Sequence, residues 1–325
     1  MEQLARGEDR RTPSGRKNRV ARHFPFEYAL PMPVIDVILL LVLSAIWGSS
    51  FIFMRYLAPL IGPIATADMR MFIAGVCLVV FFAIIRFSPQ WRKNWKHFLV
   101  IGLLNSAVPF VLYSVAALYL PASMEAIFNS LSPMFGAIFA ALWLGEVLTA
   151  RKLIGLVLGI AGVVVMSSLG DVTASVSTAL SIAACLLAPA CYGLAGAYIK
   201  KRASAVPPRA IAGGSQLFGG IALMPFLFVS PPALPPISAA LVLLVLAFAV
   251  LCSAVAYLIY YRLIADVGPT KALTVTFLIP VFAMLWGAMF LREGIRASTV
   301  AGAAIILAGT FLVAAPRRRP VPSCG

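Results

Sequence analysis

Long apolar runs recur along almost the whole chain, and they constrain the fold more than any other feature. Of the 325 residues, 62% are hydrophobic and 11% are charged, whereas a soluble domain averages about 45–50% apolar and about 25% charged residues. A membrane-spanning helix needs about 20 mainly apolar residues. Ten windows qualify: 34–54, 64–85, 98–120, 122–144, 152–169, 179–199, 210–229, 239–263, 269–291 and 297–315. The sequence therefore predicts an all-α membrane protein with ten transmembrane helices.

Lysine and arginine are unevenly divided between the two sides of these windows. Short cytoplasmic loops are enriched in both residues. With the N-terminus inside, 22 of the 26 fall in the two tails or in the loops after even-numbered windows, and the exceptions are Arg55, Arg70, Arg292 and Arg296. This division predicts a multi-pass protein of a cell (inner) membrane with both termini cytoplasmic.

The two ends of the chain differ from the windows. Residues 1–33 are basic and carry little hydrophobicity, so we expect a disordered cytoplasmic tail there. A cleaved signal peptide is the alternative, but the first apolar run is too long and lacks a small-residue cleavage pattern. Residues 316–325 form a second cytoplasmic tail. The basic charge suits anionic lipid, and no nucleic-acid partner is expected.

The two halves of the chain repeat each other. Residues 131–146 read LSPMFGAIFAALWLGE and residues 278–293 read LIPVFAMLWGAMFLRE, so that Pro133 corresponds to Pro280 and Glu146 to Glu293 at an offset of 147. Each half holds five windows, and an odd number makes the second copy enter the bilayer from the opposite side. We therefore predict two inverted five-helix repeats, at 34–169 and 179–315. Inverted repeats are typical of secondary transporters, which bind substrate near the midplane between the halves.

Four segments also resemble a known family: ALYLPAS (117–123), NSLSPMFGAIFAALWLGE (129–146), AYLIYYRLIADVGPTKA (256–272) and TFLIPVFAMLWGAMFLRE (276–293). Over about residues 36–315 the chain is similar to the EamA-type branch of the drug/metabolite transporter superfamily. The resemblance implies a bundle of ten helices that moves small metabolites, often outward. Two positions depart from the family pattern: Arg292 replaces a glycine, and Glu125 stands where a small residue is usual.

Pro109, Pro133 and Pro280 each interrupt one of these apolar windows. A proline cannot donate to the carbonyl four residues earlier, so Pro109, Pro133 and Pro280 should free the carbonyls of Asn105, Asn129 and Thr276. Within a bilayer, such a break survives only against protein or a water-filled cavity. A packing kink would explain one proline, whereas two at corresponding positions favour a central cavity.

Polar and aromatic residues on the same windows are the candidates to line that cavity. Glu125, Asn129 and Ser132 share one helix face, as do Ser253, Tyr257 and Tyr260. Trp47 and Tyr192 lie at equivalent depths, each followed by a glycine that permits close approach. The candidate substrate-binding residues are Trp47, Asn105, Tyr113, Glu125, Asn129, Ser132, Pro133, Tyr192, Tyr257, Tyr260, Thr276 and Pro280; core packing is the alternative role for each.

Glu125 lies towards the outer end of its window, but it is the only carboxylate well separated from the putative helix caps and from the first turns around Asp36 and Asp68. A charge within the bilayer is costly, so it has either a partner or a function. One interpretation is a salt bridge to Arg55 or Arg70. The other is that Glu125 binds a substrate amino group or takes up a proton, which would couple transport to protons. Glu146 and Glu293, in contrast, should accept hydrogen bonds from the start of the next helix, and glycines such as Gly155 and Gly302 should allow close helix packing.

These features favour a secondary transporter, specifically an exporter, of small amphipathic metabolites such as amino acids or their derivatives, working by alternating access. The alternatives are a passive channel and an intramembrane enzyme. An enzyme would need a catalytic constellation, yet both histidines, His23 and His97, lie outside the windows or at their edge. No nucleotide-binding motif or metal-binding cysteine spacing occurs, so no cofactor, metal or direct ATP drive is expected. The substrate, the coupling ion and the oligomeric state do not follow from these patterns.

Overall fold

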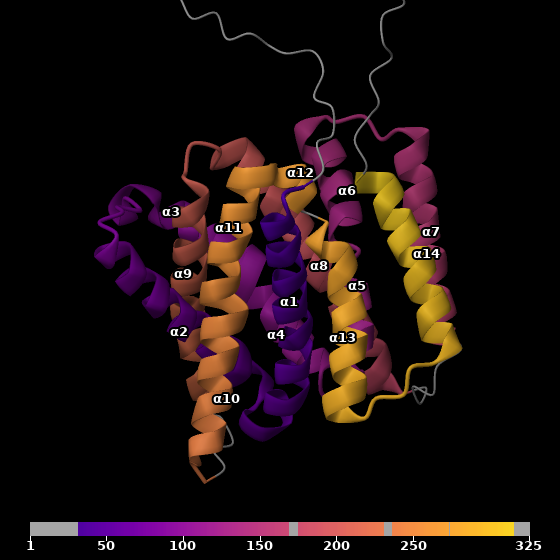
Figure 1. Cartoon of the computed structure of the whole chain (residues 1–325), viewed down its shortest axis with the longest axis horizontal. Helices are drawn as coiled ribbons and strands as arrows, with labels where there is room; N and C mark the ends of the chain where they lie inside the picture. Colours follow the sequence, from indigo (N-terminus) through magenta and orange to yellow (C-terminus); the bar gives the residue numbers. More distant parts are fainter. Residues whose placement is uncertain (1–31, 169–174, 231–235, 273, 315–325) are drawn as a thin grey trace, which may run out of the picture.

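The computed structural model describes residues 32–168, 175–230, 236–272 and 274–314, and the regular elements within them are helices (Figure 1). The first half contains α1 (Val34–Ile61), α2 (Pro63–Ile84), α3 (Trp91–Gly102), the π-helix η1 (Leu103–Ala107), α4 (Val108–Ala116), α5 (Ala122–Asn129), α6 (Ser132–Leu144) and α7 (Ala150–Ser168). The second half contains α8 (Val176–Arg202), α9 (Pro208–Val229), α10 (Ala239–Ala249), the π-helix η2 (Val250–Val255), α11 (Ala256–Val267), α12 (Pro269–Ala272), α13 (Val275–Leu291) and α14 (Ala297–Ala314).

Each of the ten predicted windows coincides with a helix or a run of helices, five in each half. Eight of the described helical segments are long and apolar enough to cross a membrane, and the shorter apolar helix α13 has 17 residues. The start of α1 and the end of α14 lie at the same face of the bundle (Figure 1), as an even number of spans requires. The prediction of a ten-helix, all-α membrane fold in two halves is confirmed. The predicted tail at 316–325 and residues 1–31 of the other tail lie outside the described residues.

The two halves meet through helix pairs that follow the repeat. Helix α1 packs on α13 and α8 packs on α6, which are corresponding pairs. At Gly48, a Cβ atom would lie 2.8 Å from Cβ of Phe282 and 3.0 Å from the amide nitrogen of Ala283. At Gly193, a Cβ atom would lie 2.6 Å from the carbonyl carbon of Phe135. The two glycines therefore admit a neighbouring backbone.

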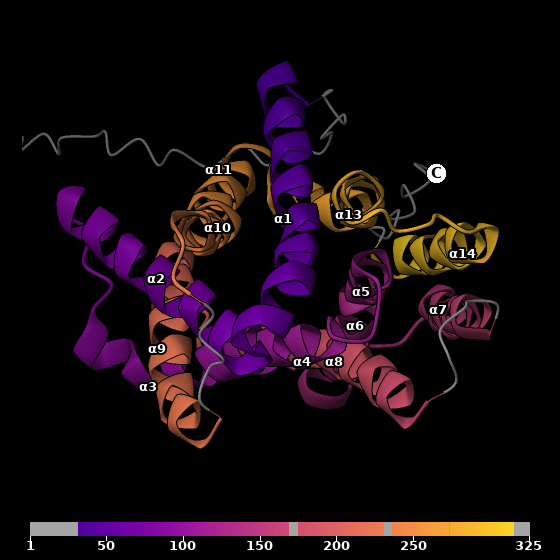
Figure 2. The ribbon, with the colours of Figure 1, turned by 90° about the horizontal axis from the view of Figure 1, so that it is seen from below.

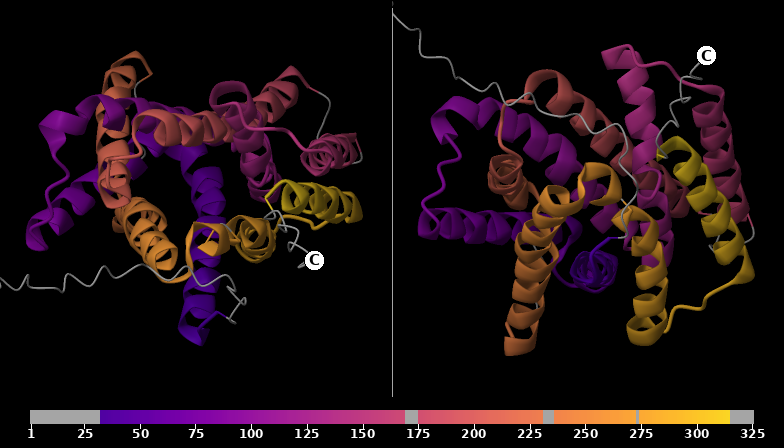
Figure 3. Two further views of the ribbon diagram at one scale, coloured as in Figure 1. Left: turned by 90° about the horizontal axis from the view of Figure 1, so that it is seen from above. Right: turned by 45° about the horizontal axis from the view of Figure 1, so that its top comes forward.

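A further pair, α7 and α14, lies at one end of the molecule (Figure 2). A Cβ atom on Gly162 would lie 2.9 Å from the carbonyl oxygen of Gly302, and one on Gly302 would lie 2.9 Å from the carbonyl oxygen of Gly162. The sequence left open whether these glycines pack within one chain or between subunits. In the structure they join the two halves of one chain, and Figure 3 shows the same two helices side by side from another direction.

Irregular helix turns also occur at matching places in the halves. The π-helices η1 and η2 begin at Leu103 and Val250, which correspond at the offset of 147 residues. Pro109 follows η1, but Ala256 occupies the corresponding position after η2. The first irregularity therefore has a proline as its sequence signal and the second has none. A π-turn displaces backbone groups from the regular hydrogen-bond pattern and often occurs at functional sites.

The close contact at Gly193 yields a test of how the halves are joined. We expect Gly193→Ala to lower the unfolding free energy by about 1–3 kcal/mol, because the added methyl group meets backbone that cannot move aside. Thermal unfolding in detergent measures the effect. Gly196→Ala is the matched control on the same helix, since a Cβ atom there would meet nothing within 4 Å. Equal melting temperatures for the two variants would contradict the close-packing account.

Candidate functional site

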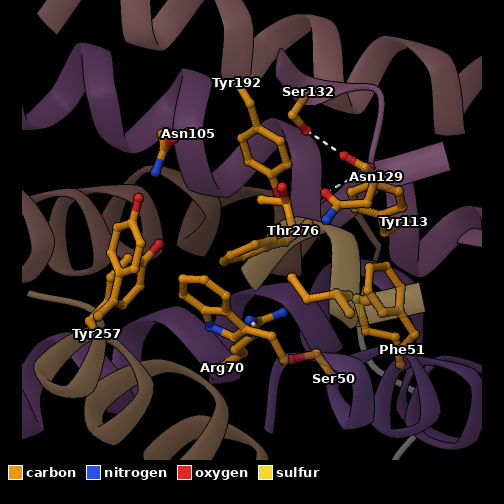
Figure 4. Close-up of a pocket in the computed structure, with 15 residues that line it drawn as sticks. Ser50, Phe51, Arg70, Asn105, Tyr113, Asn129, Ser132, Tyr192, Tyr257 and Thr276 are labelled. Atoms are coloured by element: carbon orange, nitrogen blue, oxygen red, sulfur yellow. Dashed lines mark hydrogen bonds between the residues drawn. The ribbon is translucent and has the colours of Figure 1, made fainter. Parts of the chain in front are cut away.

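A cavity of about 260 Å³ lies between the two halves, near the middle of their helices. Helices α1, α2, α4, α5, α6, α8, α11 and α13, together with η1, contribute side chains to its wall (Figure 4). The lining residues are Trp47, Ser50, Phe51, Met54, Arg70, Asn105, Phe110, Tyr113, Asn129, Ser132, Tyr192, Tyr257, Tyr260, Thr276 and Ile279. Nine of them are among the twelve residues proposed from the sequence. Glu125, Pro133 and Pro280 do not line it.

The wall of the cavity follows the internal repeat. Tyr113 and Tyr260 are corresponding residues, and so are Phe110 and Tyr257; all four line the cavity. Trp47 packs against the second half, with its ring centre 5.3 Å from that of Tyr260 and 6.1 Å from that of Tyr257. These rings give the cavity a large aromatic surface built by both halves. Aromatic rings with polar tips suit a substrate that has both apolar and polar parts.

Polar groups are held in place around the same space. The hydroxyl group of Tyr113 donates to Oδ1 of Asn129 at 3.2 Å. The hydroxyl group of Ser132 donates to the backbone oxygen of Asn129 at 2.6 Å. Both hydrogen bonds fix Asn129, and Figure 4 shows its side chain facing the cavity opposite Asn105. The side-chain amide of Asn129 is thus oriented by Tyr113, and its backbone carbonyl is held by Ser132, before any ligand binds.

The prolines act differently from one another in the structure. Pro133 lies in the first turn of α6, directly after a break between α5 and α6, whereas Pro280 lies inside α13. The carbonyl of Asn129 is not left free, because Ser132 donates to it. This corrects the expectation of a bare carbonyl at that position. The physical reason is that a hydroxyl group near a break can replace the missing amide donor.

Six lining residues are not among the sequence candidates, namely Ser50, Phe51, Met54, Arg70, Phe110 and Ile279, and Arg70 is the one of them that carries a charge. It was counted among the charges of the outer face, but its side chain is buried and lines the cavity. Its Nε atom donates to the hydroxyl oxygen of Ser253 at 2.9 Å, and its guanidinium carbon lies 4.0 Å from the ring centre of Phe110. The only sequence signal for Arg70 is that it is an arginine within an apolar window. Because it lies near the start of that window, the sequence alone suggests a position at the membrane surface.

Glu125 occupies a closed position beside the cavity. Its side chain is fully buried, and neither carboxylate oxygen has a hydrogen-bond partner among the described residues. The predicted salt bridge is not found in the described part of the chain: Arg70 contacts Ser253, and Arg55 donates to the carbonyl oxygen of Ala117. The interpretation of Glu125 as one half of an ion pair is therefore corrected.

The two glutamates that end the repeated motif hold the halves together at opposite faces. Glu293 accepts hydrogen bonds from the amide of Ala122 at 2.8 Å and from the amide of Ser123 at 3.4 Å, so it caps α5 of the other half. This corrects the expectation that it caps the next helix. Its counterpart Glu146 accepts from Nζ of Lys200 at 2.6 Å, and this hydrogen bond lowers the pKa of Glu146 below its usual range.

A second cavity of about 560 Å³ lies between α1, α10, η2 and α13. Apart from Ser49, Tyr56 and Trp286, its lining side chains are wholly hydrocarbon, and several, such as Phe290, are exposed on the outside of the bundle. Such a surface suits lipid chains. The central cavity, with its amides, hydroxyl groups and arginine, is the better candidate for a polar substrate.

Comparison with known proteins agrees with this architecture. The EamA-like transporter family matches residues 35–168 and again residues 179–315. The chain is 28% identical over 284 residues to the uncharacterized transporter YvbV of Bacillus subtilis, covering 85% of this chain and 90% of the relative. It is 27% identical over 255 residues to the uncharacterized inner membrane transporter YedA of Escherichia coli K12, covering 76% of this chain and 80% of the relative.

A solved crystal structure shows the same fold. It shares 17% sequence identity with this chain, covers 86% of this chain and 96% of its own, and aligns with a TM-score of 0.59. The two family matches together span most of the chain and coincide with the two structural halves. The chain therefore belongs to the EamA-like transporter family, and it is a multi-pass membrane transporter rather than an enzyme.

Proposed function

We propose that this transporter exports small amphipathic metabolites, such as amino acids or their derivatives, across a bacterial-type inner membrane. The observation that carries the proposal is the central cavity, whose wall is assembled from corresponding residues of two inverted halves. Its aromatic rings suit an apolar body, and its amides and hydroxyl groups suit polar substituents. A volume of about 260 Å³ limits the substrate to a small molecule.

Alternating access is supported by the difference between the two faces. At one face, Glu293 of the second half holds the first turn of α5. At the other face, the described partners of the corresponding Glu146 are Lys200 and Lys152, at 2.6 and 3.8 Å. Halves of similar sequence thus make different contacts at the two faces. In inverted-repeat transporters, exchange of such contacts between the halves moves the opening from one side to the other.

Transport itself can be tested with the purified full chain in proteoliposomes. We expect saturable uptake of at least one radiolabelled amino acid or amino-acid derivative, with counterflow when the same compound is loaded inside. A carrier shows both properties because each substrate molecule occupies one cavity per cycle. A flux that rises linearly with concentration and lacks counterflow would instead indicate a passive channel, and absence of flux across a broad metabolite panel would refute transport of this class.

Glu125 does not line the cavity, so it is not placed to bind a substrate amino group. We propose instead that it carries the coupling proton. Arg55 and Glu293 are the charged groups that act on it, with Tyr113 and Cys185 also close by. We expect Glu125→Gln to lose uptake driven by a proton gradient but to keep counterflow, because the amide cannot release a proton. The melting temperature of this variant should not fall, because the carboxylate of Glu125 makes no hydrogen bond with the described residues that the substitution could remove. Unchanged proton-driven uptake with lower stability would give Glu125 a structural role.

The orientation with both termini in the cytoplasm remains a prediction. In a background without native cysteines, a membrane-impermeant maleimide applied to intact cells should label Ser175→Cys and Ser230→Cys. Ser88→Cys should react only after the cells are opened, because the loop that contains Ser88 is rich in positive charge, as cytoplasmic loops are. All three positions are exposed in the structure, so accessibility is matched. Labelling of Ser88→Cys in intact cells would reverse the orientation.

A further inference from the structure

We propose that Arg70 is the binding residue for the carboxylate group of the substrate, so that the transported compounds are small organic acids with an apolar or aromatic body. This inference rests on the proposed transport through the central cavity and names the chemical class that this cavity accepts. It begins with Arg70, which is the one cationic side chain among the described residues that line the cavity, the others being neutral.

The guanidinium group is held rigidly by the protein. Its plane is contacted by two rings, with its central carbon 4.0 Å from the ring centre of Phe110 and 4.8 Å from that of Phe248. Its Nε atom donates to Ser253 at 2.9 Å, and its Nη2 atom donates to the carbonyl oxygen of Cys252 at 3.3 Å. Both acceptors belong to η2. The irregular turn thus positions the arginine.

One edge of the guanidinium group remains available. An arginine has five N–H donors, and the hydrogen bonds described above, with a longer one from Nη2 to Ser50 at 3.5 Å, use Nε and Nη2. The Nη1 atom donates to no described residue. It is also not one of the fully buried polar atoms without a hydrogen-bond partner, so it keeps some accessible surface. Figure 4 shows the guanidinium group of Arg70 directed into the cavity. The free donors therefore face the space that a substrate would occupy.

The positive charge of Arg70 has no compensating carboxylate in the described part of the chain. The ion pairs described there join Glu146 to two lysines and Arg262 to Asp266, and none includes Arg70. The ionisable groups that face it are the Cys252 thiol and the phenols of Tyr192 and Tyr257, which are uncharged groups. A buried cation without a partner is costly, and an anionic substrate would supply the missing charge.

The charge balance selects a carboxylate. An arginine presents parallel donors that match the two oxygens of a carboxylate, and one guanidinium group neutralises one carboxylate. A phosphate monoester carries about −1.5 to −2 charges at pH 7, so it would leave excess negative charge among aromatic side chains. An amine cation would meet like charge at Arg70 and no acidic side chain in the lining. The cavity thus disfavours both classes.

The test compares acids with their uncharged amides, using the detergent-purified full chain. The probes are isobutyrate, benzoate and 3-phenylpropionate, each paired with its amide, together with phenyl phosphate and 2-phenylethylamine. Ligand binding raises the melting temperature by an amount that grows with the logarithm of the ratio of ligand concentration to dissociation constant, so titration of each probe gives its affinity. We expect at least one acid to bind tenfold or more tightly than its amide, and tighter than the phosphate or the amine. Binding of none of the acids, or tighter binding of phenyl phosphate, would overturn the assignment.

Variants then locate the preference. Arg70→Gln should remove the preference for acid over amide, and Arg70→Lys should keep it with weaker binding, because a lysine preserves the charge but not the paired donors. Lys93→Gln is the control, since it removes an exposed positive charge from a helix of the same half without touching the cavity. An acid preference that persists in Arg70→Gln would overturn the proposal. If the Arg70 variants do not fold, the comparison of acids with amides in the unmodified protein still tests the proposal, because that comparison needs no variant.

Flux distinguishes this inference from the function on which it rests. Saturable transport of a metabolite without a carboxylate, unaffected by Arg70→Gln, would overturn the role of Arg70 while leaving the transporter function intact. Binding of acids without flux of any metabolite would refute the proposed transport but not the binding site.

Discussion

The two halves of this protein are joined by backbone contacts at glycines, and the other features depend on that closeness. Lipid chains are as apolar as leucine side chains, so helices in a bilayer associate through tight packing more than through the hydrophobic effect. Gly48 and Gly193 are related by the repeat, as are Gly155 and Gly302. Each meets backbone or Cβ atoms of the other half. The interface is therefore built twice from one pattern, and the cavity lies between the two copies.

Within the bilayer, buried polar groups need hydrogen-bond partners in the protein. Some polar groups of this structure have such partners, and others do not. Around the cavity, hydroxyl groups of Ser132 and Ser253 satisfy a carbonyl and an arginine. Glu125 has no such partner among the described residues. Removing an unpaired buried carboxylate costs no interaction, whereas keeping one is unfavourable. The stability of the fold does not explain its presence, and for this reason we propose that Glu125 takes part in coupling.

The halves are alike in sequence but not in conformation. Pro133 begins α6 after a break, whereas Pro280 lies within the continuous helix α13. Glu293 caps a helix of the opposite half, and Glu146 pairs with lysines. A pair of inverted repeats in two different conformations is asymmetric across the membrane. Exchange of the two conformations would produce the opposite asymmetry, which is the basis of alternating access.

The sequence by itself determined the ten helices, the two inverted halves and most of the aromatic and amide lining of the cavity. These follow from hydropathy and from residues that recur at a fixed offset, such as Tyr113 and Tyr260. Only the tertiary structure decided the direction of the charged side chains. Arg70 lies near the start of its helix and was assigned to the membrane surface, yet rings from α4 and α10 and acceptors from η2 hold it inside. The turn η2 has no proline to mark it, and Glu293 caps a helix some 170 residues away in the chain. Such contacts depend on which helices become neighbours, and local sequence patterns do not encode that choice.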